Sequence, residues 1–435
     1  MRSYENILKK IEDYSATLGV IGLGYVGLPL AVAKAQAGYR VVGFDVDTER
    51  VNCLQAGSSY IRDISSDDIK DQVVHGRLSA TNDFSIMKRL DAISICVPTP
   101  IDKYRQPDLT YLNAAIKEIV IHLPSTMLII INSTTFPGTT EEVVKPIIEK
   151  KVGAIGEDVF LAYSPERIDP GNRQFQIKGI PRIVGGVTKQ CTTLSARLYE
   201  KVLKEKLYRV DSTGIAEMSK IVENTFRLVN IGLINELAVL CHKMNLDIWK
   251  VIEAASTKPY GYMPFYPGPG IGGHCIPVDP HYLVWKAKEY NYNTQLVEIA
   301  AQVNESMPSF VVFRMTMMLN EMKKTMKDSN ICIIGAAYKK NVSDLRESPV
   351  MKIFELLELY EVNWSYHDPH IASIDLFEKN SVALEPNIMA QQDLVVIATD
   401  HDCIDYQCIA DHANVIFDTR SKMSTMKCQG TYVKL

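Results

Sequence analysis

The sequence predicts an α/β protein in which two doubly wound units are joined through a helical middle. Two separate blocks of the chain alternate short β-rich runs with helical stretches, and a long segment of helical periodicity lies between the blocks. Alternating strands and helices are typical of a parallel sheet that carries helices on both faces. A chain of 435 residues is long enough for two or three such domains.

The first block predicts five strands, because five short runs are rich in β-branched and aliphatic residues: Thr17–Ile21, Arg40–Phe44, Ala92–Val97, Met127–Asn132 and Val159–Tyr163. Helices are predicted between these runs, at Leu28–Ala37 and Leu112–Leu123. We therefore expect a parallel sheet in the first half of the chain.

The pattern changes near Thr213. Apolar residues at helical spacing predict one long helix over Ile215–Met244 and a second from Thr294 to about Lys323. Strands return after the polar segment Lys323–Asn330, and four are predicted: Ile331–Ile334, Asn363–His367, Leu394–Ala398 and Val415–Phe417. The tail is therefore expected to be a second α/β unit.

Composition excludes several classes of partner. The net charge is −4 and no long run of one sign occurs, so we expect neither a nucleic-acid partner nor an anionic membrane surface. The longest apolar runs are too short to span a membrane, and the first residues lack the apolar stretch of a signal peptide. The nine cysteines form no Cys-x-x-Cys pair, which favours reduced thiols in the cytoplasm over disulfides or a zinc site.

A glycine fingerprint predicts the cofactor. Gly22-Leu-Gly24-Tyr25-Val26-Gly27 follows the first strand and opens the first helix, the arrangement in which a helix N-terminus stabilises a pyrophosphate. Asp45 closes the next strand at the spacing of the acid that binds a ribose 2′-hydroxyl and repels a 2′-phosphate, so NAD is favoured. Arg50 keeps NADP open, because a nearby arginine can accommodate that phosphate.

Other candidate residues follow later strands. Thr99 and Thr134 come after two strands of the first sheet, and ligands of such sheets bind at the carboxyl ends of the strands. The second α/β unit keeps only Gly335 of a glycine fingerprint, but Lys339, Arg346 and Arg420 lie at or after its strand ends. These bases suit a phosphate-bearing ligand, and a solvated surface position remains the alternative for each.

Cys275 lies in a long irregular segment. Ser256–Leu283 contains six prolines and five glycines, so we expect neither helix nor ordinary strand there. Glycines around Cys275 leave room for a ligand, and Asp279 follows four residues later. A thiol beside a carboxylate, downstream of a nicotinamide site, predicts oxidation through a covalent thioester; the alternative is a small apolar core cysteine.

Lys220 and Asn224 are four residues apart and share one face of the predicted long helix. With them, the sequence resembles the UDP-glucose/GDP-mannose dehydrogenase family over nearly its whole length. The matching motifs are Val-Ile-Gly22-Leu-Gly-Tyr-Val-Gly-Leu-Pro-Leu, Val97-Pro-Thr-Pro, Ser164-Pro-Glu-Arg, Lys220-Ile-Val-Glu-Asn224, Gly272-Gly-His-Cys-Ile-Pro-Val-Asp279 and Tyr338-Lys-Lys-Asn-Val-Ser-Asp-Leu-Arg-Glu-Ser-Pro349.

The resemblance implies two Rossmann-like domains joined by a central helical domain: an NAD-binding domain over residues 1–212, a central dimer-forming domain over 213–326 and a UDP-binding domain over 327–435. It also implies roles. Cys275 corresponds to the nucleophile, Lys220 and Asn224 to the oxyanion pair, Asp279 and Glu166 to the groups that act on water, and Thr134 to the threonine beside the reacting centre. Cofactor contacts are implied for Gly22, Gly24, Tyr25, Val26, Gly27, Asp45, Arg50, Thr99, Thr134 and Arg346, and substrate contacts for Glu166, Arg167, Lys220, Asn224, Tyr266, Gly272, Lys339 and Arg420.

The implied reaction oxidises the C6 hydroxymethyl group of a UDP-sugar to a carboxylate. This removes four electrons and needs two NAD, and a thiolate traps the intermediate aldehyde.

Two departures from the glucose-type members bear on the choice of sugar. Those members carry a second Glu where Pro170 stands in this sequence. They also carry an arginine upstream of the cysteine, which has no clear counterpart here in the region of Lys258 and Tyr266. Three segments resemble the branch that acts on UDP-N-acetylglucosamine for surface polysaccharides: Lys103-Tyr-Arg-Gln-Pro-Asp108, Ser164-Pro-Glu-Arg-Ile-Asp-Pro-Gly-Asn172 and Pro264-Phe-Tyr-Pro-Gly-Pro-Gly270. UDP-glucose, UDP-N-acetylgalactosamine and UDP-N-acetylmannosamine are the alternatives.

Two other functions compete with this one. A two-electron β-hydroxyacid dehydrogenase would share the first half but need neither Cys275 nor a second α/β unit, and a UDP-sugar sensor would not need the catalytic set. A Cys275–His274 pair is disfavoured, because adjacent side chains of an extended backbone point to opposite faces. Metal ligation by His367, His370, His401, Asp402 and Cys403 is also disfavoured, since these residues follow strands and suit polar loops.

Overall fold

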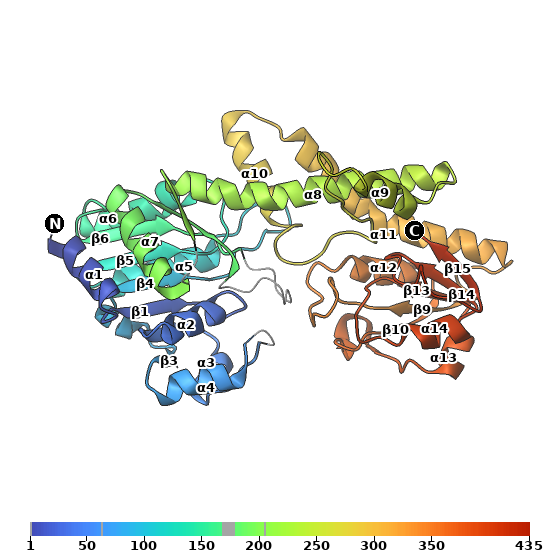
Figure 1. The fold of residues 1–435 in the computed structure, drawn as a ribbon, viewed down its shortest axis with the longest axis horizontal. Helices are drawn as coiled ribbons and strands as arrows, with labels where there is room; N and C mark the ends of the chain where they lie inside the picture. The colour runs from blue at the N-terminus through green and yellow to red at the C-terminus, as the bar shows by residue number, and fades with distance from the viewer. Residues whose placement is uncertain (1, 62–63, 168–178, 204–205) are drawn as a thin grey trace. The chain divides into compact units, whose positions relative to one another are not determined.

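The computed structural model describes residues 2–61, 64–167, 179–203 and 206–435. The chain forms two compact units, one made of Met1–Glu223 with His281–Asn291, and one made of Asn224–Pro280 with Tyr292–Leu435. The helix α8 (Thr213–Lys243), light green in Figure 1, passes from the first unit into the second.

The first unit is built on an eight-stranded sheet in the order β3-β2-β1-β4-β5-β6-β7-β8. All neighbouring strands are parallel except β6 and β7. The order of the first six strands is that of a dinucleotide-binding fold, in which the chain reverses direction across the sheet between β1 and β4. The strands are β1 (Thr17–Ile21), β2 (Arg40–Phe44), β3 (Leu78–Thr81), β4 (Ala92–Ile95), β5 (Met127–Ile131), β6 (Val159–Tyr163), β7 (Arg182–Gly186) and β8 (Leu207–Val210).

Helices accompany this sheet, and its central strands are buried along their whole length. Strands covered on both faces read as continuous apolar runs, which explains Met127–Ile131. The helix α3 begins where the Asp47 side chain accepts hydrogen bonds from the backbone of Glu49 and Arg50. The helices are α1 (Arg2–Glu12), α2 (Gly27–Gln36), α3 (Thr48–Gln55), α4 (Ser66–Val74), α5 (Thr110–His122), α6 (Lys145–Val152) and α7 (Lys189–Leu203).

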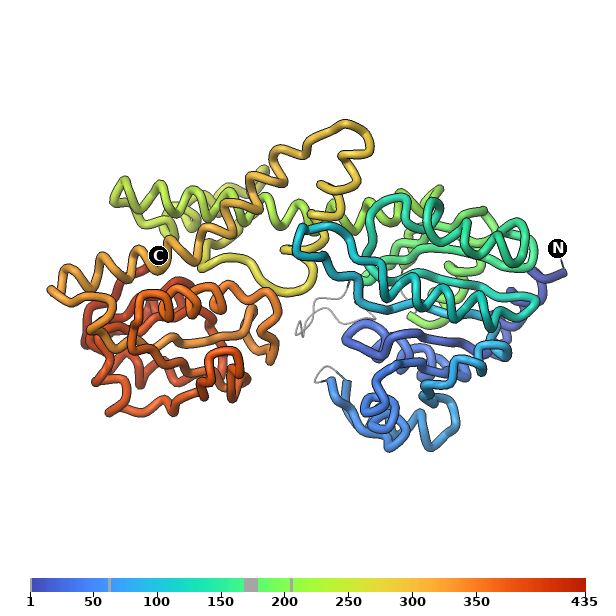
Figure 2. The backbone as a smooth tube through the Cα atoms, turned by 180° about the vertical axis from the view of Figure 1, so that it is seen from behind, coloured from blue at the N-terminus to red at the C-terminus, as the bar shows by residue number. Residues whose placement is uncertain are grey.

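The second unit combines long helices with a five-stranded parallel sheet in the order β10-β9-β13-β14-β15. This is the other common doubly wound order, and its strand order reverses between β9 and β13. The strands are β9 (Asn330–Ile334), β10 (Asn363–His367), β13 (Leu394–Ile397), β14 (Val415–Asp418) and β15 (Thr431–Lys434), beside a small hairpin of β11 (Ser373–Ile374) and β12 (Lys379–Asn380). These strands, orange to red, stay together in one body in both views (Figure 1, Figure 2).

The helices of the second unit are α9 (Ile248–Ser256), α11 (Gln295–Glu321), α12 (Pro349–Leu359), α13 (Pro386–Ala390) and α14 (Tyr406–His412). The helix α10 (Asp279–Ala287) begins in this unit and ends in the first. No helix among the described residues is both long enough and apolar enough to cross a membrane.

The predicted fold class is confirmed, and each predicted strand and helix named above is present within a few residues of its predicted ends. One expectation is wrong: Ser256–Leu283 is not irregular throughout, because α9 still includes Ser256 and α10 begins at Asp279. Pro280 is accommodated because the first residues of a helix need no hydrogen bond from their backbone nitrogen. Short strands such as β7, β8 and β15 were not predicted. Their runs are brief and partly polar.

Candidate active site

The glycine loop after β1 has the geometry of a diphosphate cradle. Gly22 has a φ of +83°, and a Cβ there would lie 2.7 Å from the carbonyl oxygen of Cys96. A Cβ at Gly27 would come within 1.7 Å of the Gly22 carbonyl oxygen, so the loop and the start of α2 require both glycines. A Cβ at Gly24 would meet nothing within 4 Å, which leaves open space beside the backbone where a phosphate can approach.

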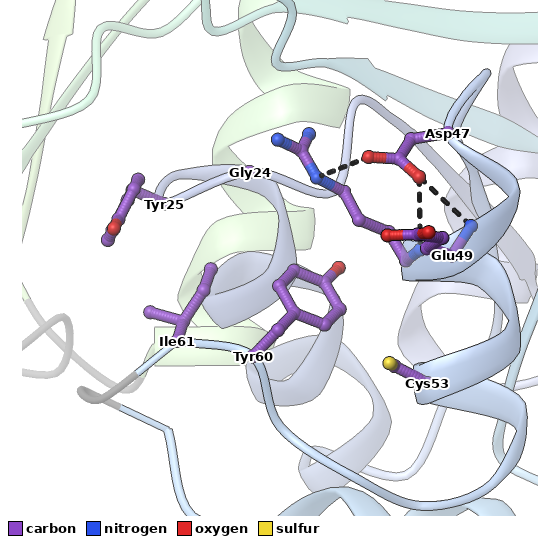
Figure 3. A pocket seen from close by; sticks show the side chains of 8 residues that line it. Gly24, Tyr25, Asp47, Glu49, Cys53, Tyr60 and Ile61 are labelled. Carbon is purple, nitrogen blue, oxygen red and sulfur yellow. Dashed lines mark hydrogen bonds and ion pairs between the residues drawn. The ribbon is translucent and has the colours of Figure 1, made fainter. Parts of the chain in front are cut away.

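A pocket of about 310 Å³ lies beside this loop (Figure 3). Its size is at the lower end of the range of small-molecule sites. Tyr60 is fixed in its wall by a hydrogen bond from its hydroxyl to the Leu23 carbonyl oxygen, 2.7 Å away. The lining residues are Gly24, Tyr25, Asp47, Glu49, Arg50, Cys53, Tyr60 and Ile61. The open glycine backbone and this adjoining pocket fit the diphosphate and adenosine of NAD.

Asp45 is buried at the end of β2, where its carboxylate accepts hydrogen bonds from the backbone nitrogens of Leu23 (2.8 Å) and Asp47 (3.0 Å). The guanidinium of Arg50 lies 3.5 Å from Asp45 and 3.3 Å from Asp47. The positive charge of Arg50 is therefore shared between two carboxylates. This pairing weakens the case for a 2′-phosphate site and supports NAD over NADP.

Replacing Asp45 with alanine should raise the KM for NAD by roughly tenfold or more, because a charged hydrogen-bond acceptor is lost. The preference for NAD over NADP should fall as well, since the repulsion of a 2′-phosphate disappears. Steady-state kinetics with each cofactor measures both effects, and Arg50→Ala is the matched variant. If the wild-type protein uses NADP as well as NAD, Arg50 and not Asp45 governs the pocket.

The carboxyl ends of β4 and β5 bring the two predicted threonines together. The Thr99 hydroxyl donates to the Thr134 carbonyl oxygen at 2.6 Å, and the hydroxyl of Tyr282 from α10 donates to the Thr99 carbonyl oxygen. Both threonines thus lie at the edge of the sheet predicted to line the cleft. Tyr282 was not predicted as a site residue, because nothing in the sequence links it to Thr99, which lies 183 residues earlier.

Glu166, predicted to act near water, is almost completely buried after β6. Its carboxylate accepts from the Arg182 guanidinium and from the Arg167 backbone nitrogen, the latter at 2.7 Å. Burial opposes the charge of Arg182, but the neighbouring Glu166 carboxylate raises the pKa of Arg182 above its ordinary value. The guanidinium also lies 4.5 Å from the ring centroid of Tyr199. Arg182 therefore holds Glu166 in place, and sequence reasoning missed it.

Arg167 and Lys220 also belong to the first unit. The Arg167 guanidinium forms an ion pair with Glu223 of α8, with a closest distance of 2.6 Å, and donates to the Pro181 carbonyl oxygen at 2.7 Å. Lys220 is buried on α8, one turn before Asn224, which is buried as well. The segment 168–178, with Pro170, lies outside the described residues.

In the second unit, Cys275 lies in the turn that enters α10. Its carbonyl oxygen accepts from the backbone nitrogens of Val278 (3.2 Å) and Asp279 (2.8 Å), and its side chain is half-buried. The Asn224 side-chain amide donates to the Asp279 carboxylate at 2.5 Å, and both side chains are buried. The structure therefore joins the Asn224 amide to the Asp279 carboxylate at the start of a helix whose first turn is hydrogen-bonded to the Cys275 backbone.

The imidazole of His274 lies near the carboxylate of Asp344. Its Nε2 lies 3.9 Å from a carboxylate oxygen of Asp344. Burial, and then the charge of Arg346, lower the pKa of His274.

The glycine-rich loop before Cys275 packs tightly on the last α/β sheet. A Cβ at Gly272 would lie 2.6 Å from the Glu347 carbonyl oxygen, and one at Gly268 would lie 2.5 Å from the guanidinium of Arg420. The Gly273 nitrogen donates to the Arg346 carbonyl oxygen at 3.2 Å. Tyr266, also in this loop, stacks on Trp249 with ring centroids 6.0 Å apart.

The three predicted phosphate-binding bases lie on the loops after strands of the second sheet. Lys339 follows β9 and is partly buried. Arg420 follows β14 and donates from Nε to the Ala398 carbonyl oxygen at 2.8 Å, beside the loop of Gly268. Arg346 precedes α12, where its exposed guanidinium pairs with Asp344 at 2.8 Å. Among the described residues, no cluster of histidine, cysteine, aspartate or glutamate is suited to hold a metal ion.

Comparison with known proteins identifies the family of the chain. Three models of the UDP-glucose/GDP-mannose dehydrogenase family match the chain: the NAD binding domain over residues 16–203, the central domain over 215–306 and the UDP binding domain over 332–425. The UDP-N-acetyl-D-glucosamine 6-dehydrogenase of Pseudomonas aeruginosa is 34% identical over 84% of this chain and 85% of its own. The UDP-N-acetyl-D-mannosamine dehydrogenase of Pyrococcus horikoshii is 35% identical over 88% of this chain and 89% of its own.

Solved structures give the same result. The structure of the UDP-N-acetylmannosamine dehydrogenase from Pyrococcus horikoshii superposes with a TM-score of 0.87 at 32% identity, covering 96% of this chain and 98% of that one. The native structure of the UDP-N-acetylmannosamine dehydrogenase Cap5O from Staphylococcus aureus superposes with a TM-score of 0.84 at 31% identity. The match covers 96% of this chain and 98% of that one. With its NAD-binding loop and its UDP-binding domain, this chain belongs to the UDP-glucose/GDP-mannose dehydrogenase family and is an NAD-dependent UDP-sugar 6-dehydrogenase.

Proposed function

We propose that the protein oxidises the C6 hydroxymethyl group of UDP-N-acetylglucosamine to the carboxylate, forming UDP-N-acetylglucosaminuronate for surface polysaccharides. The observation that carries the mechanism is the hydrogen bond from Asn224 to Asp279 at the start of α10, in the turn that also contains Cys275. The Cys275 side chain is partly exposed, which supports its proposed reaction with an aldehyde, and the Asp279 carboxylate four residues later would act on water.

NAD, held by the glycine loop Gly22–Gly27 and Asp45, would supply the hydride acceptor for the two oxidations. The first step removes the C6 hydride and the hydroxyl proton and leaves an aldehyde. The Cys275 sulfur then adds to the carbonyl carbon, and the resulting thiohemiacetal loses its own hydride and hydroxyl proton to become a thioester. Water cleaves the thioester, which releases the carboxylate and the thiol.

Lys220 and Asn224 would stabilise the negative charge that develops on the C6 oxygen when sulfur or water attacks. Asp279, held by Asn224, would take the proton from the attacking water. Glu166 would orient that water, with Arg182 keeping its carboxylate in one position. Thr134 would lie beside the reacting centre.

The substrate contacts that the family resemblance implies are proposed as well. The nucleotide would bind through Lys339 and Arg420, with Tyr266 and Arg167 contributing further contacts. Gly272 would shape the loop beside the substrate, where its lack of a side chain allows close packing against Glu347. Arg346 would contact NAD. Three domains, with boundaries near residues 212 and 326, would carry these tasks.

The acetamido sugar is proposed because relatives that act on UDP-N-acetylglucosamine and on UDP-N-acetylmannosamine match this chain about equally well. The sequence segments discussed above favour the first. The test is NADH formation against UDP-N-acetylglucosamine, UDP-N-acetylmannosamine, UDP-N-acetylgalactosamine and UDP-glucose, with the product identified by mass. Two NADH per UDP-N-acetylglucosamine support the proposal, one NADH or an aldehyde product overturns the mechanism, and faster turnover of another sugar overturns the substrate.

A cytoplasmic setting is proposed as well. All nine cysteines are free thiols, as expected in a reducing compartment.

A homodimer is proposed through α8. The side chains of Phe226, Leu233, Leu237, Leu240 and Met244 recur at helical spacing and are 37–57% exposed. An adjacent face of the same helix is buried in its own unit, through Ile234, Ala238 and Cys241. An apolar stripe of this length on an exposed helix suits a self-complementary contact between two copies.

Replacing both Leu233 and Leu240 with glutamate should convert the dimer to a monomer, because charges would be buried without partners. Light scattering coupled to size-exclusion chromatography measures the mass. Leu376→Glu is the matched control, since Leu376 is a 72% exposed leucine in the segment between β11 and β12. A wild-type protein that is monomeric at micromolar concentration would contradict the proposed dimer.

A further inference from the structure

A buried carboxylate ties together the loops at the carboxyl edge of the second sheet. Asp368 follows β10, and its Oδ2 accepts hydrogen bonds from the backbone nitrogens of Ala336 (2.7 Å) and Ala337 (3.0 Å), which follow β9. Its Oδ1 accepts from the backbone of His370 (2.7 Å) and Ile371 (3.1 Å). Burial alone would raise the pKa of Asp368, but the hydrogen bond from His401 and these amides lower it to about 2. The carboxylate is therefore ionised, and both of its oxygens accept hydrogen bonds.

His401 extends this network to the next strand. It follows β13 and has no exposed surface. Its Nε2 lies 3.0 Å from Oδ2 of Asp368, and its Nδ1 accepts from the Asn341 backbone nitrogen at 2.8 Å. Because that backbone nitrogen can only donate, Nδ1 must carry a lone pair, and the proton must sit on Nε2. The two partners thus fix one neutral tautomer of the imidazole.

Lys339 lies between the anchored residues. On one side, the Thr399 hydroxyl donates to the Ala337 carbonyl oxygen at 2.7 Å. On the other side, Asn341 adopts a φ of +63° and exchanges two hydrogen bonds with Asp402, of 2.6 Å and 2.9 Å. Both ends of the turn 337–341 are therefore bound to the segment after β13. This turn lies where the strand order reverses, the place at which doubly wound sheets bind their ligands.

We propose that His401 is a positioning residue for the nucleotide: it bridges Asp368 and the Asn341 backbone and so fixes the turn that carries Lys339 at the UDP site. This inference rests on the proposed role of Lys339. A turn that is ordered before binding loses less conformational freedom when the diphosphate arrives, so the bridge should raise affinity for UDP and leave NAD binding unchanged.

The bridge requires a side chain at position 401 that donates a hydrogen bond to Asp368 and accepts one from the Asn341 backbone nitrogen. Glutamine presents an oxygen and an NH₂ group at the end of a long side chain and can replace both contacts of His401. Asparagine has the same groups but is one methylene shorter, so it can reach one partner only. Leucine fills the space and offers neither contact. The expected order of UDP affinity is therefore wild type, His401→Gln, His401→Asn and then His401→Leu.

Calorimetric titration with UDP, together with the KM values for the UDP-sugar and for NAD, tests the proposal on the full-length protein. We expect His401→Leu to weaken UDP binding about tenfold or more, His401→Gln to recover most of that loss, and the KM for NAD to change less than twofold. His412→Leu, a substitution of an exposed histidine on α14, is the matched control and should keep wild-type affinity.

Lys339→Ala separates this inference from the proposed function. If Lys339→Ala leaves UDP affinity unchanged, the proposed UDP site itself is wrong. If Lys339→Ala weakens UDP binding while the folded His401 variants keep wild-type affinity, the positioning role is wrong. Should His401→Leu fail to fold, the comparison of glutamine with asparagine decides: equal wild-type affinity in both overturns the proposal, and stronger binding by glutamine supports it.

Discussion

Replacing Cys275 with serine should abolish steady-state turnover while leaving a burst of NADH. Serine has nearly the same volume, but its alkoxide is much harder to form and is a poorer leaving group. If the hydroxyl still adds to the aldehyde, oxidation yields an ordinary ester, which resists hydrolysis. The steady-state rate should fall by at least ~10³-fold, the scale expected when a nucleophile is removed.

Rapid-mixing measurements of NADH would record the burst, and intact mass spectrometry would detect a sugar bound to the protein. Folding should survive, because serine has nearly the volume of cysteine and the turn keeps the hydrogen bonds from Val278 and Asp279 to the backbone carbonyl oxygen of residue 275. Cys408→Ser is the matched control, since Cys408 is another partly buried free thiol. Near wild-type production of NADH by Cys275→Ser would show that the reaction does not pass through this sulfur.

Local patterns predicted most of the fold and the chemical groups of the candidate site. The glycine fingerprint could be read because Gly22 and Gly27 are required by contacts within a few residues and one neighbouring strand. Strands such as Met127–Ile131 could be read because burial on both faces makes the whole run apolar. The start of α10 was missed because prolines usually end helices, whereas Pro280 occupies the first turn.

Residues that act through other residues could not be predicted. Arg182 looks like one charged residue at the start of an apolar strand, and only the fold brings it to Glu166. His401 and Asp368 are 33 residues apart and meet because β10 and β13 flank β9 in the sheet. Such pairs leave no periodicity and no fixed spacing in a single sequence, so the structure is needed to find them.

The matching prediction for the last chemical step concerns Asp279. Asp279→Asn keeps the shape of the side chain, and its amide oxygen can still accept the hydrogen bond from Asn224, but it cannot take a proton from water. Both oxidation steps should proceed, and hydrolysis of the thioester should slow by roughly 100-fold or more, the usual contribution of a general base. The enzyme should therefore accumulate as a thioester on Cys275.

This variant has a signature that differs from that of Cys275→Ser. Two NADH per site should appear in a rapid burst, followed by slow turnover, and intact mass should show the acylated protein; hydroxylamine should release the sugar, because thioesters react readily with it. Asp405→Asn is the control, since Asp405 also lies at a helix start, where its side chain accepts from Gln407 and Cys408. A variant that loses the burst itself would place Asp279 in the oxidation steps, and one with wild-type kcat would remove it from catalysis, leaving Glu166 as the carboxylate that acts on water.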